Sequence, residues 1–345
     1  MSIKVLCVGD PHFKVNNVPE SDDMTNKLVK IAEHIKPKII VLLGDILHTH
    51  EKIHVSPLMR AEKLVRQLSQ ISPTFVIIGN HDRPNNSTYL TDDHAFNAMK
   101  QWPNTYVIDD KVLDTNIAGH RFLFVPYVFP SLFMSTLTHE EKGVKDPLLN
   151  TTAIFCHQEF LNAKMGMIES KAGDPWDTNN PLVISGHVHD YDRLQHNLIY
   201  VGTPMQHAFG DKDDKTVSLF TFDNSNSKIS WNEDRIDLGL IKRVIVYITP
   251  EEIHTYEPPT DKLIKLTIRG DSSSIAAVKK LEKINELRKQ GININFKVIK
   301  TTEEPRKGPV LRMRYKDRFY SEICQNSKQL DWFDKLFNSI NKINK

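Results

Sequence analysis

The sequence predicts a layered α/β protein with a second, smaller α+β domain, and three observations support this. The first 238 residues alternate apolar strand runs with amphipathic helical patterns. The strand runs are continuously apolar, as in sheets that are covered on both faces. After residue 238 the alternation starts again over residues 239–305, a segment that is small but viable beside a larger neighbour.

Eight strand runs are readable in the larger domain. They lie at 3–8, 38–43, 74–78, 121–125, 151–156, 181–184, 198–201 and 217–222. Helices at 25–36 and 57–70 fit between the early strands, because apolar residues recur there at i, i+3, i+4 and i+7. Ser56 and Pro57 are typical of the cap and first turn of the second helix. Residues 92–102 predict a weaker third helix.

The smaller domain has its own short pattern. Strands are predicted at 243–248, 263–268 and 292–299. One helix is predicted at 274–290, ending at Gly291. A linker with proline and glycine follows. We therefore expect three parts, at 1–238, 239–305 and 306–345.

Composition is that of an ordinary globular protein, 39% hydrophobic and 26% charged. No apolar run approaches the ~20 residues of a membrane helix, and the N-terminal residues enter a strand without signal-peptide regions. Of three cysteines, Cys7 and Cys156 lie in apolar strand runs, which favours buried free thiols in a reducing compartment. We expect a cytoplasmic protein without membrane association, in the host cytoplasm if the source is viral.

The net charge of +2 hides an asymmetry along the chain. Residues 1–238 carry a balance of −7, whereas residues 239–345 carry +9. The acidic part would accept cations, and the basic part would tolerate a polyanion. From charge alone, two solvated surfaces of opposite sign explain the pattern equally well.

Polar side chains follow five strand runs at the point where each run ends. The runs lead into GDPH at 9–12, GD at 44–45, GNHD at 79–82, His157, and SGHVH at 185–189. In α/β sheets, ligands gather at the carboxyl ends of strands, where loops from several strands converge. Glycine suits a backbone that turns sharply at such a crowded place. We therefore expect one shared site.

Seven of these residues offer metal-binding atoms, and none is a thiolate. They are Asp10, His12, Asp45, Asn80, His157, His187 and His189. A mixed oxygen and nitrogen set suits Mn²⁺, Fe or Zn²⁺, whereas Ca²⁺ and Mg²⁺ prefer oxygen. Two ions ~3.5–4 Å apart that share a carboxylate would use all seven donors. Each motif alone is more often structural, but their joint occurrence in this order favours a metal site.

The ordered set GDPH…GD…GNHD…H…GHVH resembles the calcineurin-like metallophosphoesterase superfamily over roughly the first 205 residues. GDILH at 44–48, the loop YVGTPMQHAFGD at 200–211 and the small second domain resemble SbcD-type subunits of DNA double-strand-break repair nucleases. This resemblance implies a four-layer αββα sandwich, a smaller α+β capping domain and a C-terminal helical tail. Thr203 stands where this family more often has serine, and the resemblance implies no role for His207.

The resemblance also implies how the donors divide. Asp10, His12 and His189 would bind one metal, Asn80, His157 and His187 the other, and Asp45 would bridge them. His81 would contact the scissile phosphate and stabilise or protonate the departing oxygen, with Asp82 holding its ring. His48 and Arg83 are candidates for DNA contact. His50 and His54 are by default exposed polar residues.

The position of positive charge favours DNA over other phosphoesters. The candidates are Lys279, Lys280 and Lys283 on the predicted helix of the small domain, and Arg306 and Lys307 in the basic segment after it. Binding to a phosphate backbone needs such clusters, although a lysine-rich helix face is usually only solvated. Two Mn²⁺ ions, with Mg²⁺, Fe or Zn²⁺ as alternatives, would neutralise the phosphodiester and lower the pKa of a water molecule.

An apolar stripe at helical spacing lies near the C-terminus. It consists of Trp332, Phe333, Leu336, Phe337 and Ile340. Packing on its own domain is the default interpretation, and binding in the groove of another protein is the alternative. SbcD-type proteins pair with an SMC-like ATPase of SbcC type through such a helix, so the resemblance implies this partner, together with DNA and a homodimer.

Three functions are left open. The leading one is a Mn²⁺-dependent DNA nuclease, exonuclease or endonuclease, acting with an SMC-like ATPase in DNA end processing, recombination and repair. The second is a phosphomonoesterase or cyclic-nucleotide phosphodiesterase in which the small domain is a lid. The third is a scaffold subunit with an inactive site, and the complete donor set argues against it.

Overall fold

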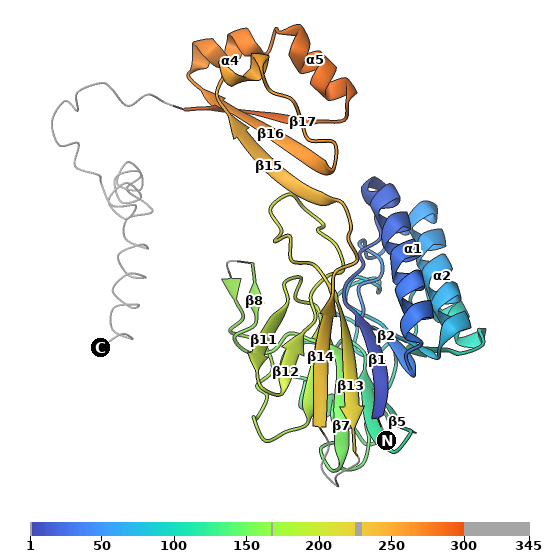
Figure 1. Ribbon diagram of the computed structural model, residues 1–345. Helices are drawn as coiled ribbons and strands as arrows, with labels where there is room; N and C mark the ends of the chain where they lie inside the picture. The colour runs from blue at the N-terminus through green and yellow to red at the C-terminus, as the bar shows by residue number, and fades with distance from the viewer. Residues whose placement is uncertain (1, 167, 225–229, 300–345) are drawn as a thin grey trace, which may run out of the picture. The chain divides into compact units, whose positions relative to one another are not determined.

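The structure is a computed structural model that describes residues 2–166, 168–224 and 230–299 (Figure 1). The chain divides into two compact units, Met1–Lys297 and Val298–Lys345. Several predicted contact residues lie outside the described residues: Arg306, Lys307, Trp332, Phe333, Leu336, Phe337 and Ile340. The DNA and partner contacts expected of them therefore stay predictions.

The first sheet has six strands in the order β14-β13-β1-β2-β3-β4. Their bounds are β1 Ser2–Val8, β2 Ile39–Leu42, β3 Thr74–Ile77, β4 Thr105–Ile108, β13 Val217–Asp223 and β14 Ser230–Ile236. β1 to β4 pair in parallel, and β13 and β14 add antiparallel strands beside β1. Two helices, α1 Val18–Ile35 and α2 Val55–Ile71, lie side by side against this sheet (Figure 1). Leu28 of α1 and Leu64 of α2 are buried in the hydrophobic core that the two helices share with this sheet.

The second sheet also has six strands, in the order β11-β12-β10-β7-β6-β5. Their bounds are β5 Leu113–Ile117, β6 His120–Val125, β7 Thr151–His157, β10 Leu182–Gly186, β11 Asp192–Gln195 and β12 Leu198–Tyr200. Its outer face is covered by the short helix α3, Phe133–Leu137, and by loops that bury Phe160 and Trp176. A small hairpin, β8 Lys164–Met165 and β9 Ile168–Glu169, rises from one of these loops.

The inner faces of the two sheets pack on each other. Val5 and Val41 of the first sheet and Phe155 of the second belong to this shared core, and the rings of Phe75 and Phe124 stack across it at 4.2 Å. The predicted layered α/β sandwich is confirmed. Its outer layers are unequal, because two long helices cover the first sheet whereas one short helix and loops cover the second.

The second α+β pattern of the chain is a three-stranded sheet with two helices. Its elements are β15 Lys242–Ile248, β16 Lys262–Gly270, α4 Ser272–Val278, α5 Glu282–Lys289 and β17 Asn293–Val298. The carboxylate of Asp271 caps α4 by accepting hydrogen bonds from the N–H groups of Ser273 and Ser274. The single helix predicted at 274–290 is wrong, because Leu281 adopts an extended conformation and packs on the core of this sheet.

Other predicted boundaries also need correction. α2 begins at Val55, so Ser56 lies inside the helix, where its hydroxyl accepts from Arg60 at 2.8 Å. The helix predicted at 92–102 is only a short 3-10 helix, Asn97–Gln101. Two further 3-10 helices are Val15–Asn17 and Glu252–His254.

Two expectations from composition can be compared with the structure. Cys7 and Cys156 are buried free thiols, as predicted. Within the described ranges, no helix combines the length and apolar character needed to cross a membrane.

Candidate metal centre

All seven predicted donors come together at the carboxyl ends of the strands. Asp10, Asp45 and Asn80 follow β1, β2 and β3 of the first sheet. His157 is the last residue of β7, and His187 directly follows β10 of the second sheet. The site is therefore built at the same edge of both sheets, where ligands of α/β proteins usually bind.

The donors form two groups. In the first, ligand atoms of Asp10, His12 and His189 all lie within 4.8 Å of one another, and His12 Nε2 is 3.1 Å from His189 Nε2. In the second, His157 Nε2 and His187 Nδ1 are each 3.0 Å from Asn80 Oδ1. These two ring nitrogens are 3.2 Å apart.

Asp45 lies between the groups. Its Oδ2 is 3.6 Å from His12 Nε2 of the first group and 3.4 Å from His157 Nε2 of the second. One carboxylate oxygen is thus beside both sets of donors, in the position that a bridging ligand needs.

Several donors have a strained backbone. Asp10, His12, Asp45 and His187 have φ values of 43°, 45°, 49° and 81°, which residues with a Cβ rarely adopt. The N–H of His187 donates to the Asp10 carboxylate at 3.0 and 3.1 Å. The N–H of His81 donates to Asp45 Oδ1 at 2.8 Å. Such strain is common at sites where side-chain direction matters more than local stability.

Glycines allow the loops to approach this closely. A Cβ on Gly79 would collide with Oδ1 of Asp45, and one on Gly186 would collide with the carbonyl oxygen of Leu43. Gly44 has φ +95° and lies against the ring of His157. The glycines of the GD, GNHD and GHVH motifs are therefore needed for space as well as for turning.

The protonation states of four donors, His12, Asp45, His187 and His189, suit cation binding. Burial lowers the pKa of His12, His187 and His189, that of His187 to about 3, so these rings are neutral. Burial opposes ionisation of Asp45, but His157 and His12 outweigh it and hold the pKa of this carboxyl well below its usual range. Burial lowers the pKa of His157, yet the carboxylates of Asp45 and Asp10 together raise it to about 9.

The residues present fit a pair of divalent cations. The neutral rings of His12 and His189 have nitrogens 3.1 Å apart, and a shared cation can accept the lone pairs of both. The neutral ring of His187 lies 3.2 Å from His157, whose Nε2 would give up its proton to a bound cation. The ionised Asp45 would supply the negative charge between two ions. Nitrogen and oxygen donors without thiolate suit Mn²⁺, Fe or Zn²⁺.

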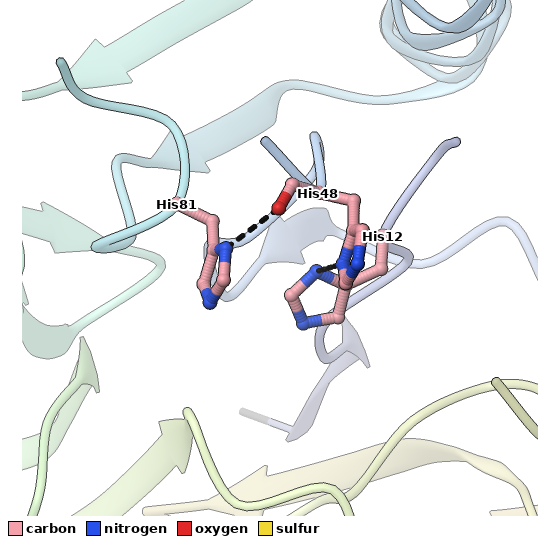
Figure 2. Close-up of side chains that lie close together, drawn as sticks. All are labelled: His12, His48 and His81. Atoms are coloured by element: carbon pink, nitrogen blue, oxygen red, sulfur yellow. Dashed lines mark hydrogen bonds between the residues drawn. The ribbon is translucent and has the colours of Figure 1, made fainter. Parts of the chain in front are cut away.

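His81 lies beside the first donor group, and its ring offers a nitrogen within 4.8 Å of ring nitrogens of His12 and His48. Its Nδ1 is 2.7 Å from the carbonyl oxygen of His48, and the His48 ring approaches His12 with Nδ1 atoms 3.4 Å apart (Figure 2). The other ring nitrogen, Nε2, is 4.0 Å from Asp45 Oδ2. His50, expected as an exposed polar residue, is half-buried and stacks on the His81 ring at 4.6 Å.

The role expected for Asp82 is wrong. Its carboxylate accepts from the N–H of Leu47 at 2.9 Å and from that of Gly79 at 3.0 Å, while the His48 carbonyl holds the His81 ring. Asp82 is buried and ties the loop after β2 to the loop after β3. Burial and the nearby Asp45 raise its pKa to about 7.

The DNA contact expected of Arg83 stays a prediction, and the structure shows a buried side chain. The side chain is 2% exposed, its guanidinium lies 4.9 Å from the centre of the Tyr127 ring, and Nη1 donates to the carbonyl of Thr88 at 2.8 Å. Of the lysines in the small domain, Lys279 and Lys280 are exposed. Lys283 is half-buried and pairs with Glu257 at 2.6 Å.

Three residues that were not predicted form hydrogen bonds with backbone carbonyl groups of the first donor group. His207 Nε2 is 2.9 Å from the carbonyl oxygen of Asp10. Asn17 Nδ2 donates to the carbonyl of His12 at 3.1 Å, and Lys215 Nζ to that of His189 at 2.8 Å. His207 lies in the loop at 200–211, which is a recognisable motif of the sequence. Asn17 and Lys215 belong to no motif, so their sequence context does not indicate a role at the site.

A cleft of about 510 Å³ opens over the donors. Its floor includes Asp45, Asn80, His81, His187 and His189. Its lining also includes Met165 and Gly166 of the β8–β9 hairpin and residues 210–212. A substrate in this cleft would lie directly over both donor groups.

The site combines two groups of oxygen and nitrogen donors, with Asp45 between them and His81 beside them. This arrangement at the edge of two packed sheets is that of a metal-dependent hydrolase of phosphoester bonds. The comparison with protein families agrees. Residues 3–191 match the family model described as calcineurin-like phosphoesterase, and the chain belongs to this family.

Two viral proteins are similar over most of this chain. "Putative phosphoesterase 078R" of Invertebrate iridescent virus 3 is 36% identical over 307 residues, which are 87% of this chain and 86% of that protein. "Putative phosphoesterase 244L" of Invertebrate iridescent virus 6 is 38% identical over 280 residues, 80% of this chain and 97% of that protein. Among solved structures, an archaeal phosphodiesterase aligns at 12% identity and a TM-score of 0.34, over 68% of this chain and 100% of its own.

Proposed function

We propose that this hydrolase is a Mn²⁺-dependent DNA nuclease subunit that cuts phosphodiester bonds in DNA end processing, recombination and repair. The observation that carries the proposal is the division of charge, −7 over residues 1–238 against +9 over residues 239–345. A metal-binding domain of negative charge repels DNA by itself, so a basic region on the same chain supplies the attraction that a polyanion needs.

The geometry of His81 suits a leaving-group acid. The His48 carbonyl accepts from Nδ1–H, and this contact orients the ring. Nε2 is the nitrogen nearer to Asp45 and the cleft. A protonated Nε2 can donate to the departing oxygen of a phosphodiester. A pair of divalent cations, when bound, would neutralise the phosphate and lower the pKa of a water molecule.

Exposed cations of the small domain would supply part of the DNA contact. Lys279 and Lys280 are solvent-exposed at the end of α4, whereas Lys283 would first have to leave Glu257. His48 would contact DNA at the cleft, where its carbonyl already fixes His81. Binding through such contacts weakens steeply with salt.

The decisive experiment compares substrates for the purified full chain with Mn²⁺. Labelled linear duplex, covalently closed circular duplex and p-nitrophenyl phosphate are offered under the same conditions, with EDTA as the metal-free control. We expect Mn²⁺-dependent cleavage of DNA and slow turnover of the monoester. Rapid hydrolysis of p-nitrophenyl phosphate without any cleavage of DNA overturns the nuclease function and favours a monoesterase.

The assembly is part of the proposal. The C-terminal stripe from Trp332 to Ile340 would bind an SMC-like ATPase, and the nuclease would act as a homodimer in the cytoplasm. Co-purification with a candidate coiled-coil ATPase tests this, with a chain that lacks residues 319–345 as the comparison. A complex that persists after this deletion contradicts the partner assignment.

A further inference from the structure

The β8–β9 hairpin presents large apolar side chains to solvent. Met165 is 39% exposed and Ile168 is 71% exposed. Leu161, at the base of the hairpin, is also exposed. Single apolar side chains on a surface need no explanation, but several on one short hairpin beside a functional cleft indicate a contact surface.

The base of the hairpin is firmly held. Phe160 and Ala163 are buried in the core outside the second sheet. The N–H of Asn162 donates to the carbonyl of Ser170 at 2.9 Å, and the N–H of Ser170 donates to that of Ala163 at 2.8 Å. Because β7 ends at His157, only a few residues separate this base from a metal donor. The apolar side chains therefore have a fixed place relative to the donors.

The hairpin is also a wall of the catalytic cleft. Met165 and Gly166 line the same cleft as His81, His187 and His189, together with residues 210–212. A molecule that fills this cleft above the donors would contact Met165. This position suits a substrate with an apolar or aromatic group next to its scissile phosphate.

Lysines accompany the apolar side chains. Lys164 precedes Met165 on β8 and lies opposite Glu169 of β9. Lys171 pairs with Glu169 at 2.9 Å, and Lys212 of the cleft pairs with Asp190 at 3.1 Å. Apolar side chains next to lysines that a ligand can recruit fit a molecule that is aromatic in one part and anionic in the next, as a nucleotide is.

We propose that the β8–β9 hairpin contacts the nucleobase beside the scissile phosphate. Met165 and Ile168 lie against the face of this base, and Lys164 lies near the phosphate that follows it. This inference rests on the proposed nuclease function. It implies that the rate of cleavage depends on the presence of a base beside the cleaved bond. Contact with a base face is tolerant of sequence, because every base has such a face.

The test uses two single-stranded oligonucleotides that differ at one position. One carries a normal base beside the cleaved bond, and the other carries an abasic tetrahydrofuran residue there. The variant is Met165→Ala combined with Ile168→Ala. The matched control is Leu149→Ala, which truncates an apolar side chain that is 60% exposed and does not line the cleft. Bound manganese and thermal melting are measured for each protein.

For the wild type, we expect kcat/KM on the normal oligonucleotide to be about 10-fold higher than on the abasic one. The double variant should cut both at the lower rate, with unchanged manganese content, and Leu149→Ala should behave as the wild type. The hairpin contact alone is overturned if the wild type has the same kcat/KM on both oligonucleotides. It is also overturned if the double variant loses the same factor of kcat/KM on both. A hairpin that instead docks a protein or a membrane leaves both rates unchanged in the double variant, which also overturns it.

Failure of the nuclease function has a different signature. A wild-type protein that cuts neither oligonucleotide, yet hydrolyses bis(p-nitrophenyl) phosphate with Mn²⁺, overturns the nuclease function and the hairpin contact with it. Cleavage of the normal oligonucleotide establishes the nuclease activity whatever the abasic result.

Discussion

His207 Nε2 lies 2.9 Å from the backbone carbonyl oxygen of Asp10, a residue 197 positions earlier in the chain. Asp10 has φ 43°, a conformation that costs roughly 1–3 kcal/mol and persists only where surrounding contacts require it. Because the His207 ring is buried and neutral, with its pKa well below the usual value through burial, Nε2–H donates to this carbonyl without adding charge.

Removing this donor should weaken the first cation site. We expect His207→Leu to lower the Mn²⁺ affinity of the group of Asp10, His12 and His189 by about 10–100-fold, the size of effect typical for residues that orient ligands. His207→Gln, which keeps an N–H donor, should regain most of the affinity. Manganese titration followed by electron paramagnetic resonance separates one bound ion from two. Full affinity in His207→Leu would show that the carbonyl contact does not position Asp10.

His81 should matter for turnover and not for metal content. We expect His81→Ala to lower kcat by about 10²–10⁴-fold, as for loss of a general acid, because the His48 carbonyl orients its ring and the residue lines the cleft beside the two donor groups. Manganese content should stay at the wild-type value. His34→Ala, an exposed histidine on α1, is the control. Loss of a bound ion in His81→Ala would instead make His81 a ligand.

The absence of a side chain at Gly79 should be as important for Mn²⁺ affinity as a metal ligand. In Gly79→Ala the new methyl group would collide with Oδ1 and the backbone nitrogen of Asp45. We expect this displacement to lower Mn²⁺ affinity by at least about 100-fold. Gly210→Ala is a matched control in the same cleft, because among the described residues nothing lies within 4 Å of its added carbon. Calorimetric titration measures both variants, and equal affinities would contradict a need for space at Gly79.

A buried ion pair away from the site predicts a pH dependence of stability. Burial alone would raise the pKa of Asp109, but His94 at 2.9 Å and Lys100 at 2.6 Å lower it to about 2. A depressed carboxyl pKa stabilises the fold above about pH 4, and this contribution is lost as the pH falls from about 4 to about 2. Asp109→Asn should therefore reduce the free energy of unfolding at pH 7 by about 2 kcal/mol.

Urea denaturation at several pH values measures this effect, with the neighbouring Asp110→Asn as control. The difference between wild type and Asp109→Asn should shrink as the pH falls below 4. A difference that is constant with pH would mean that packing of Asp109, and not its charge, stabilises the fold.

Strands buried on both faces were predictable, and edge strands were not. β1 and β7 are continuous apolar runs, so their sequences differ from those of loops and helices. β11, DRLQ, and β14, SWNEDRI, lie at the edges of their sheets, and side chains along them are partly exposed. Polar residues are tolerated there, so no apolar run marks the strand.

The same contrast holds for the site. The donors were predictable because polar residues directly after buried strands are unusual in a folded core. The hydrogen bonds from the N–H groups of Leu47 and Gly79 to Asp82, and the burial of Arg83, depend on loops that meet only in the folded protein. His207 is likewise 197 positions from the carbonyl that it binds. Such long-range contacts leave no periodic pattern in the sequence.

The donors come from the loops of both sheets, with Asp45 after β2 and His157 at the end of β7. Divalent ions held by both would add to the apolar core and the few hydrogen bonds that already join the two layers. Bound ions would hold the two layers together at that edge, so their removal would favour local opening there. Amide hydrogen exchange at the ends of β2 and β7 would then be slower with manganese bound than without it.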